Sequence, residues 1–287
     1  MESATPLDIE LRDAYLTRLG WSAVPAPTIE TLFALHRANA ERIPYNTVWI
    51  AVGERRSIDP LSSVRHVARG AGGYCYHLNG AFALLLEWLG FDVQRHLGGV
   101  QARPTAAEQR PPAGANGNHL AITVADHLVD VGLGDGLHEP VPLAAGEYQQ
   151  GPFRYRLRPS EANPGGWRFD HDPRLSLAGF DWRPGPVDVA ELEPHHQLLM
   201  TSPESGFVRV VMAQRRDATG IDSLKGRMLQ RIEGDRDETR ELGDAAEWRA
   251  ALADVFGLHS FNVELSRADH VWRRICSAHH ALFAAGD

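Results

Sequence analysis

The most informative stretch of this chain reads Gly70-Ala-Gly-Gly-Tyr-Cys-Tyr-His-Leu-Asn-Gly-Ala-Phe82, with a cysteine between a run of glycines and an amphipathic helix. Apolar residues after Cys75 recur at the spacing of one helical face, and Gly90 stands where a helix C-cap glycine would. Cys75 therefore falls in the first helical turn, where unpaired N–H groups and the helix dipole stabilise a thiolate. We interpret Cys75 as a nucleophile. The alternative is a buried free cysteine in the core, the commoner fate of this residue type.

The glycine run has a second consequence for this stretch. Glycines at positions 70, 72 and 73 let the backbone approach a bound group closely. Their backbone N–H groups are suited to hold an oxyanion beside the nucleophile.

Length, charge and cysteine content limit what the chain can be. Its 287 residues exceed the size at which single cores usually stop growing, which predicts two or three modules. The net charge is −8 and no lysine- or arginine-rich run occurs, so we expect no nucleic-acid partner. An anionic ligand would have to be held locally, by backbone amides and a few arginines.

The cysteines and the hydropathy pattern point to a reducing compartment. Cys75 and Cys276 are the only cysteines, and two such distant residues make no disulfide framework. The N-terminus lacks a signal-peptide pattern, and no apolar run reaches the ~18 residues of a membrane span. We therefore expect a cytoplasmic protein without a membrane partner, in which thiols stay reduced.

The N-terminal part of the chain has a mainly helical pattern. Apolar residues mark one helical face over residues 11–19, a second over 29–36 and a third, shorter one over 64–68. Cys75 would lie on the last helix of this group. We therefore predict an N-terminal helical bundle over residues 1–90 that carries the nucleophile.

Beyond Gly90 the apolar period changes from helical toward two. Alternation over residues 91–100 and again over 120–124 indicates strands, separated by a proline- and glycine-rich loop at 103–118. Further short strands are expected at residues 128–131, 152–157, 167–170 and 179–182. Short antiparallel strands at this spacing predict a barrel or sandwich over residues 91–200.

The last part of the chain mixes strands and helices. A strand is expected over residues 207–212 and a polar hairpin around 215–220, whereas the charge-rich residues 231–241 are expected to form a solvated loop or helix face. Helices are expected over residues 245–256 and 266–285. We interpret residues 201–287 as a third, α/β module.

A thiolate nucleophile usually has a histidine base, which an acidic or amide side chain orients. His119 begins a strand, and Asp130 ends the apolar run of the next. A four-residue loop at 123–126 would make the two side chains directly opposed, and a two-residue loop at 125–126 would make them diagonal neighbours. An odd loop would put them on opposite faces. Taken alone, His119 fits a strand-edge histidine and Asp130 a turn aspartate.

A set of short motifs runs from one end of the chain to the other. They are Gly72-Gly-Tyr-Cys-Tyr-x-x-Asn79, His119-Leu, Asp130-Val-Gly-Leu-Gly, Tyr15-Leu-x-Arg-Leu-Gly20, Leu32-x-x-Leu-His36, Ile43-Pro-Tyr45, Thr201-Ser-Pro-x-Ser-x-Phe207 and Phe256-Gly-Leu258. Together they resemble the arylamine N-acetyltransferases. The resemblance implies that Cys75, His119 and Asp130 form a triad in an α+β fold of helical bundle, antiparallel β-barrel and α/β lid. Its triad is similar to that of papain-like proteases and transglutaminases.

Three positions depart from the family pattern. Ala71 stands four residues before the cysteine, where the family usually has an arginine. His77 stands two residues after it, where a Glu or Gln is common. The segment Pro44-Tyr-Asn-Thr47 replaces Pro-Phe-Glu-Asn, so Asn46 takes the place of a glutamate. These differences leave the triad intact but bear on the hydrogen bonds around it and on acceptor choice.

The resemblance implies a ping-pong transfer from acetyl-CoA to an aromatic amine or hydrazine through an acetylated Cys75. The family segment that contacts CoA corresponds to Asn116, Gly117 and Asn118, and the neighbouring strand adds Gly98 and Gly99. An arene needs an apolar slot, so acceptor contacts are expected from Tyr45, Tyr76, Phe82 and Phe207. No histidine spacing of a recognised metal site such as His-Glu-x-x-His occurs, so we expect no metal.

Three other functions remain open at this point. The same fold serves amide synthases that release a polyketide or other acyl chain from a carrier thioester. A thiol hydrolase would cleave amides and ignore acetyl-CoA. A non-catalytic binding protein would keep the fold and survive the loss of Cys75.

Overall fold

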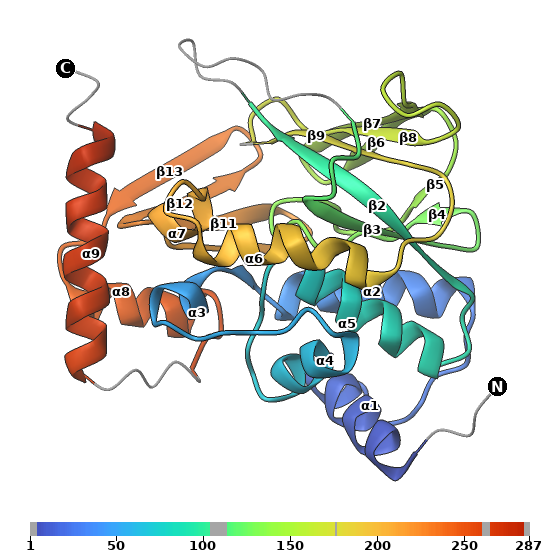
Figure 1. Cartoon of the computed structure of the whole chain (residues 1–287), viewed down its shortest axis with the longest axis horizontal. Coiled ribbons are helices and arrows are strands. Elements are labelled where there is room, and N and C mark those ends of the chain that lie inside the picture. The colour runs from blue at the N-terminus through green and yellow to red at the C-terminus, as the bar shows by residue number, and fades with distance from the viewer. Residues whose placement is uncertain (1–4, 104–113, 176, 260–264, 284–287) are drawn as a thin grey trace.

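The computed structural model describes residues 5–103, 114–175, 177–259 and 265–283. Four helices gather at one end of the molecule, close to the N-terminus (Figure 1). They are α1 (Pro6–Arg18), α2 (Ile29–Arg42), α4 (Pro60–Ala68) and α5 (Cys75–Trp88), with the short α3 (Val48–Ala51) between α2 and α4. The helices expected in this part of the chain are therefore confirmed.

Capping side chains explain where three of these helices begin. Thr5 forms a capping box with Asp8 ahead of α1, and Thr28 and Asp59 accept backbone N–H bonds ahead of α2 and α4. The residue ahead of α5 is Tyr74, whose side chain makes no such bond. The start of α5 must therefore be fixed by contacts from other parts of the chain.

Helix α5 is buried almost all round and forms the centre of the first core. Every residue from Cys75 to Ala83 is buried. A helix that is apolar on all sides belongs in the interior of a protein. Helices α1 and α4 contact α5, and so does strand β3 (His119–Val124). The helix that carries the cysteine thus packs against the strand that begins with His119.

Eight antiparallel strands form a nearly closed barrel in the order β5-β4-β3-β2-β9-β8-β7-β6. Besides β3 they are β2 (Val93–Ala102), β4 (His127–Leu128), β5 (Val141–Pro142), β6 (Gly146–Gln150), β7 (Phe153–Pro159), β8 (Trp167–Asp170) and β9 (Leu177–Trp182). Tyr148 joins the two edges, because its hydroxyl on β6 donates to the Pro142 carbonyl on β5 at 3.2 Å. Aromatic side chains fill the interior, including Phe153, Tyr155, Phe169, Phe180 and Trp182. The predicted barrel is confirmed, although part of the loop expected at 103–118 lies outside the described residues.

A second antiparallel sheet has the order β1-β10-β11-β12-β13. Its strands are β1 (Tyr45–Asn46), β10 (Met212–Arg216), β11 (Gly220–Lys225), β12 (Met228–Glu233) and β13 (Arg236–Glu241). The barrel connects to this sheet through η1 (Val189–Leu192), α6 (Glu193–Thr201) and α7 (Gly206–Arg209). Strand β1 comes from the N-terminal segment, so its pairing with β10 joins the beginning of the chain to its end. The division at residues 90 and 200 stays a prediction.

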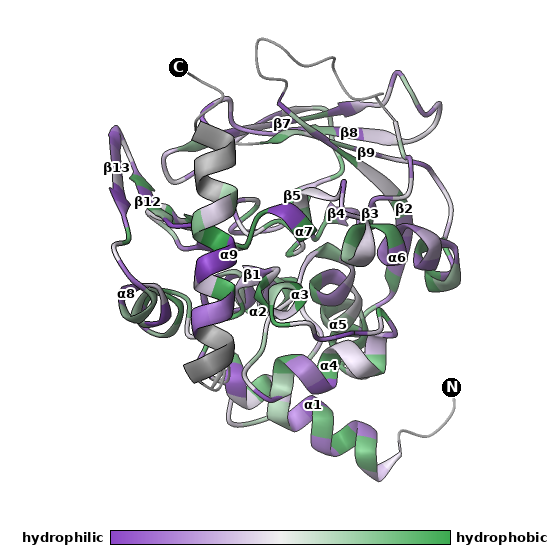
Figure 2. Cartoon of the chain, turned by 60° about the vertical axis from the view of Figure 1, so that its left-hand side comes forward, coloured by the Kyte–Doolittle hydropathy of each residue, from purple (hydrophilic) through white to green (hydrophobic). Residues whose placement is uncertain are grey.

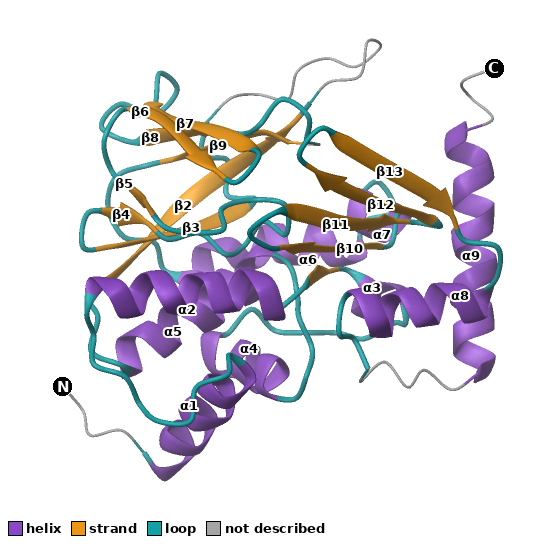
Figure 3. Ribbon diagram, turned by 180° about the vertical axis from the view of Figure 1, so that it is seen from behind, coloured by secondary structure: helices purple, strands orange, loops and turns teal. Residues whose placement is uncertain are grey.

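Helices lie along one side of the second sheet and at its end, as Figure 3 shows from behind. They are α8 (Ala245–Ala250), the π-helix at Ala251–Val255 and α9 (Leu265–Phe283). Trp248, Leu252 and Phe256 share a core with Ala213 and Leu224 of the sheet. The helices expected at 245–256 and 266–285 are thereby found, apart from the last residues, which lie outside the described part of the chain.

The strand predicted at residues 207–212 is wrong, because the chain first makes a helical turn. The hydroxyl oxygen of Ser205 accepts the Phe207 N–H at 3.2 Å, and its carbonyl accepts the N–H groups of Val208 and Arg209 at 3.1 and 3.0 Å. A serine that bonds to the backbone just ahead stabilises such a turn. This local bond overrides the β-propensity of the valines, and β10 begins only at Met212.

The charged residues 231–241 were expected in a loop or helix face, and this too is wrong, because they belong to the β12–β13 hairpin. Arg231 lies opposite Glu238, and Glu233 lies opposite Arg236. Strand β13 is exposed along its whole length and hydrophilic throughout (Figure 2). With both faces in water it has no apolar alternation to reveal it, and its charges oppose pairing with another sheet edge. Within the residues that the structure describes, no helix has the length and hydropathy of a bilayer span.

Candidate active site

Cys75 lies between the two segments that carry the predicted partners. It is the first residue of α5 and is only 4% exposed. Its thiol donates to the carbonyl oxygen of Asn118, with Sγ and oxygen 3.7 Å apart. A Cβ built on Gly132 would lie 3.0 Å from the Cys75 Cα. Cys75 is thus flanked by the residue before His119 and by the segment just after Asp130.

His119 and Asp130 are joined by a hydrogen bond of 2.7 Å between Nε2 and Oδ2. Both side chains are almost fully buried. The second carboxylate oxygen, Oδ1, accepts the Gly132 N–H at 2.8 Å. Since both oxygens of Asp130 are engaged, its orientation is fixed, and it fixes the ring of His119 in turn.

The β3–β4 hairpin explains why these two side chains meet. Its loop consists of residues 125–126, both with positive φ, as in a type I′ turn. Strand β3 pairs Thr123 with Leu128. This is the two-residue loop of the sequence analysis, in which His119 and Asp130 are diagonal neighbours on one face.

The protonation of His119 follows from its surroundings. Burial by itself lowers the pKa of His119, but the charge and hydrogen bond of Asp130, together with the nearby Cys75 thiol, outweigh it and raise the pKa to about 10. Nδ1, the other ring nitrogen, has no hydrogen-bond partner of standard geometry among the described residues. The site is therefore suited to hold an imidazolium beside the sulfur of Cys75.

Asn79 ties α5 to both partner segments, a role that the sequence analysis does not assign. Its Nδ2 donates to the Leu120 carbonyl at 2.6 Å, and its Oδ1 accepts the Val131 N–H at 2.9 Å. Each of these residues follows a predicted triad residue directly. Asn79 stands four residues after Cys75, on the same helical face. A polar residue at that spacing within an apolar helix was the available signal.

The segment predicted to contact CoA lies beside Cys75 and is fastened to β2. Gly117 N–H donates to the Gly98 carbonyl at 2.9 Å. The Asn118 side chain accepts the Val100 N–H at 2.6 Å and donates to the Val100 carbonyl at 3.2 Å. The side-chain amide of Asn118 is therefore occupied by hydrogen bonds within the fold. The groups of this segment that remain for a ligand are mainly backbone N–H and carbonyl groups.

Gly99 and Asn116, also predicted to contact CoA, hold the preceding part of the same loop. A Cβ on Gly99 would lie 2.1 Å from the Gly114 carbonyl oxygen, so only glycine fits there. The Asn116 side chain accepts the Asn118 N–H at 3.1 Å. These two residues thus have structural reasons for their identity, and their contact with CoA stays a prediction.

Two of the four aromatic residues predicted to bind the acceptor lie close to Cys75. The rings of Tyr45 and Phe207 meet edge to face with centroids 6.4 Å apart. Phe207 also packs on Tyr74, the residue before Cys75, with ring centroids 5.2 Å apart. Tyr45 forms an isolated β-bridge with Gly73, two residues before Cys75, and burial, followed by the charge of Cys75, raises the pKa of Tyr45. An apolar wall beside Cys75 is therefore present.

The other two predicted acceptor residues are engaged elsewhere. Phe82 is fully buried two turns along α5 and packs edge to face on His36 at 6.1 Å, so its prediction as an acceptor contact is wrong. Tyr76 is 1% exposed, and its hydroxyl donates to the Gly117 carbonyl at 2.5 Å. Tyr76 thus holds the loop before His119 and offers no surface to an acceptor. Apolar spacing alone does not distinguish a core aromatic from one that lines a slot.

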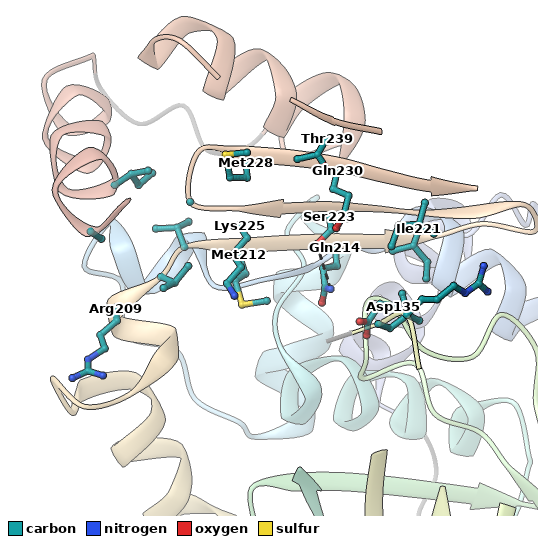
Figure 4. A pocket seen from close by; sticks show the side chains of 18 of the residues that line it. Asp135, Arg209, Met212, Gln214, Ile221, Ser223, Lys225, Met228, Gln230 and Thr239 are labelled. Carbon is teal, nitrogen blue, oxygen red and sulfur yellow. Dashed lines mark hydrogen bonds between the residues drawn. The ribbon is translucent and has the colours of Figure 1, made fainter. Parts of the chain in front are cut away.

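A cavity of about 770 Å³ opens on the face of the second sheet that α8 does not cover (Figure 4). Its floor comes from β10, β11 and β12, with side chains such as Ile221, Ser223 and Gln230. Asp135 and Gln214 also line it. Gln214 pairs with Tyr45 in the sheet, and the charges of Cys75 and Asp135 both act on Tyr45. Tyr45 therefore neighbours Gln214 of the cavity lining and is within the electrostatic influence of Cys75.

Cations line the cavity although the whole chain is acidic. Lys225, the only lysine of the chain, lines it together with Arg174, Arg209 and Arg274. Among the described residues Lys225 is exposed and has no ion pair. Arg174 is tied to Asp172 at 2.9 Å. Lys225 is thus the cation most available to an anionic ligand. No group of three or more His, Cys, Asp and Glu suited to a metal ion occurs within the described ranges.

Comparisons with known proteins agree with this architecture. A family model described as N-acetyltransferase matches residues 28–265. The arylamine N-acetyltransferase of Escherichia coli is 32% identical over 271 residues, covering 87% of this chain and 92% of that protein. Proansamycin X synthase of Amycolatopsis mediterranei is 29% identical over 254 residues, covering 85% and 95%. The structure of Mycobacterium marinum arylamine N-acetyltransferase in complex with CoA is similar with a TM-score of 0.77 at 26% identity, covering 92% of this chain and 98% of that one.

The chain therefore belongs to the N-acetyltransferase family. It is an acyltransferase, and the family and fold class expected from its motifs are confirmed.

Replacing Asn79 with leucine tests its role as a tie between α5 and the hairpin. Asn79→Leu keeps the size of the side chain but leaves the buried Leu120 carbonyl and Val131 N–H unpaired. We expect the free energy of unfolding to fall by about 2–4 kcal/mol, the cost of two unsatisfied buried groups. Urea denaturation measures this, with Asn39→Leu as a buried asparagine control away from the site. An unchanged midpoint would contradict the tie.

The His119–Asp130 pair predicts a pH-dependent stability. The folded pKa of about 10 lies above the unfolded value near 6.5, so the pair stabilises fully below about pH 6.5 and loses its effect as the pH rises through 10. We expect Asp130→Asn to destabilise the protein most at pH 6 and least at pH 10. Urea unfolding at both pH values measures this. In a His119→Gln background the pH dependence of the Asp130→Asn effect should disappear, and its persistence would assign it to another group.

Proposed function

We propose that the chain transfers an acetyl group from acetyl-CoA to an arylamine or hydrazine, with Cys75, His119 and Asp130 as the catalytic triad. The observation that carries this proposal is the buried 2.7 Å bond between His119 and Asp130 beside a cysteine at the start of a helix. The CoA complex of the M. marinum relative supports the choice of donor. Both cysteines are free thiols, which supports a reducing compartment such as the cytoplasm.

The first half-reaction acetylates the enzyme. In the resting site the proton of Cys75 is already on His119 Nδ1, and the thiolate attacks the thioester carbonyl of acetyl-CoA. The carbon–sulfur bond to CoA then breaks, and the departing CoA thiolate takes the proton from His119. Asp130 keeps the ring oriented and stabilises the imidazolium between these two transfers. The products are acetyl-Cys75 and free CoA.

The second half-reaction returns the enzyme to its starting state. The amine nitrogen attacks the acetyl carbonyl, His119 accepts a proton from the nitrogen, and the Cys75 thiolate leaves. The N-acetyl product departs and no co-reactant is needed.

Backbone amides at the start of α5 are placed to stabilise the oxyanion of both steps. The first hydrogen bonds within α5 run from the His77 and Leu78 N–H groups to the Tyr74 carbonyl. The amides of Cys75 and Tyr76 precede those bonds. We assign them to the oxyanion, where donors in a site without water are most effective.

The two substrates are assigned to different surfaces. The cavity beside Tyr45 carries Lys225 and three arginines, which suits the phosphates of CoA despite the net charge of −8. The aromatic pair Tyr45 and Phe207 suits the ring of an arylamine.

A second candidate function is an amide synthase that uses a longer acyl thioester. The cavity of about 770 Å³ has the size of sites for drug-sized ligands, far larger than an acetyl group needs. One relative of similar identity over nearly its whole length is named a synthase.

Intact mass after mixing with acetyl-CoA and no acceptor tests the proposal. We expect one acetyl group per chain, mapped to Cys75, with release of one CoA. Cys75→Ala should give no adduct, whereas Cys276→Ala should behave as the wild type. An adduct elsewhere, or none on folded protein, would refute acetylation at Cys75.

The same assay separates the two candidates. A longer acyl thioester that loads Cys75 faster than acetyl-CoA, with slow release to small arylamines, would favour the amide synthase. Fast turnover from acetyl-CoA to an arylamine favours the acetyltransferase.

A further inference from the structure

Each backbone carbonyl of the glycine run before Cys75 accepts a hydrogen bond from another part of the chain. Arg18 of α1 donates to the carbonyls of Gly70 and Ala71. Arg56 donates from Nη1 to the Gly72 carbonyl at 3.0 Å, and the Asn46 N–H donates to the Gly73 carbonyl at 2.7 Å. Glycine backbones have the greatest conformational freedom, so these outside donors set the path of the chain into the nucleophile.

Among these donors, Arg56 has a side chain that is fixed by burial, by an ion pair and by an aromatic ring. Its side chain is only 4% exposed and donates from Nε and Nη2 to Glu54 at 2.9 and 2.7 Å. The guanidinium lies 5.3 Å from the centre of the Trp49 ring. A planar group with donors in fixed directions can satisfy Glu54 and Gly72 at once, which a lysine ammonium cannot.

The backbone of Arg56 holds the residue next to Cys75 through a histidine. His196 of α6 donates from Nε2 to the Arg56 carbonyl at 2.6 Å. Its Nδ1 then accepts the hydroxyl hydrogen of Tyr74. Burial lowers the pKa of His196, in keeping with the neutral ring that this arrangement requires. Tyr74 directly precedes Cys75 and gives α5 no side-chain cap.

The departures from the family pattern fall in this same neighbourhood. Ala71 lacks the usual arginine, and His77 lacks the usual Glu or Gln. The ring of His77 packs on Trp49 at 5.2 Å and on Tyr74 at 4.8 Å, and the charge of Arg56 acts on it. His77 thus brings no carboxylate or carboxamide to this neighbourhood, and Arg56 with Glu54 supplies a charged pair from another segment.

We propose that Arg56 is a positioning residue for Cys75, which it holds through the Gly72 carbonyl on one side and through His196 and Tyr74 on the other. This rests on the proposed acyl transfer at Cys75. The residue takes no part in the chemistry. It keeps the first turn of α5 at the distance and angle from His119 that proton transfer needs.

Single-turnover acetylation of Arg56→Lys tests this inference. We expect the rate constant for Cys75 acetylation to fall about 10- to 100-fold, because displacements near 1 Å have effects of that size. The acetyl-CoA concentration for half-maximal rate should change far less, since Arg56 is buried behind the nucleophile. A rate constant counts only the folded enzyme, whereas the amplitude reports how much is folded, so a purely structural role would lower the amplitude alone.

Two further variants sharpen the result. Arg158→Lys is the matched control, because Arg158 also pairs with a carboxylate, Asp170, at 2.8 Å, but lies on the barrel; it should react as the wild type. His196→Phe removes the second arm and should slow acetylation less than Arg56→Lys. In the double variant, the loss of activation free energy should be smaller than the sum of the losses in the two single variants, since both residues hold the same segment.

Alkylation by iodoacetamide gives a readout that does not depend on acetyl transfer. The ratio of Cys75 to Cys276 modification, measured by peptide mass in one sample, should fall in Arg56→Lys. If the wild type is not acetylated, the proposed acyl transfer is refuted, and the positioning role of Arg56 is then tested by this alkylation ratio alone. A wild-type rate constant in Arg56→Lys, or a ratio equal to or above that of the wild type, would overturn the inference.

Discussion

The site depends on a charged hydrogen bond made out of contact with water. The side chains of His119 and Asp130 are 0% and 2% exposed, so water cannot replace the hydrogen bond if either side chain moves. In such surroundings a satisfied ionic pair is strong and a broken one is costly. The hairpin loop, the Gly132 amide and the close passage of Gly132 past Cys75 all serve to keep that pair in one place beside the thiol.

The first turn of α5, which carries Cys75, likewise depends on contacts with other segments. A helix that begins without a capping side chain leaves its first amides open, which is useful for an oxyanion but gives the helix no local anchor. The anchors are hydrogen bonds from α5 side chains to other segments: Asn79 bonds to the hairpin, and Tyr76 bonds to the loop before His119. The arrangement of Cys75, His119 and Asp130 is thus a property of tertiary contacts between segments far apart in sequence.

The features that could be predicted are those whose signal is local. Periodicity located the N-terminal helices, several of the barrel strands and the helix that begins at Cys75, and one of the two even loop lengths considered for the hairpin is the two-residue loop that the structure contains. The predictions were wrong where a local hydrogen bond overrides β-propensity, as Ser205 does for residues 207–212, and where both faces of a strand are exposed to solvent, as in β13. Phe82 was misassigned because an aromatic residue in the core and one that lines a binding pocket have the same spacing along the helix. Arg56 and Asn79 could be recognised only in the fold, since their partners lie on other segments, and Lys225 only because the cavity that it lines is built from several segments.

The most direct test of the account is the titration of the His119 imidazole, followed by NMR and assigned with His119→Gln. The account predicts an imidazolium at pH 7 that loses its proton only near pH 10, because Asp130 and Cys75 hold the charge. A neutral ring at pH 7, titrating near the ordinary histidine value of about 6.5, would show that the carboxylate does not brace the imidazole and would contradict the account.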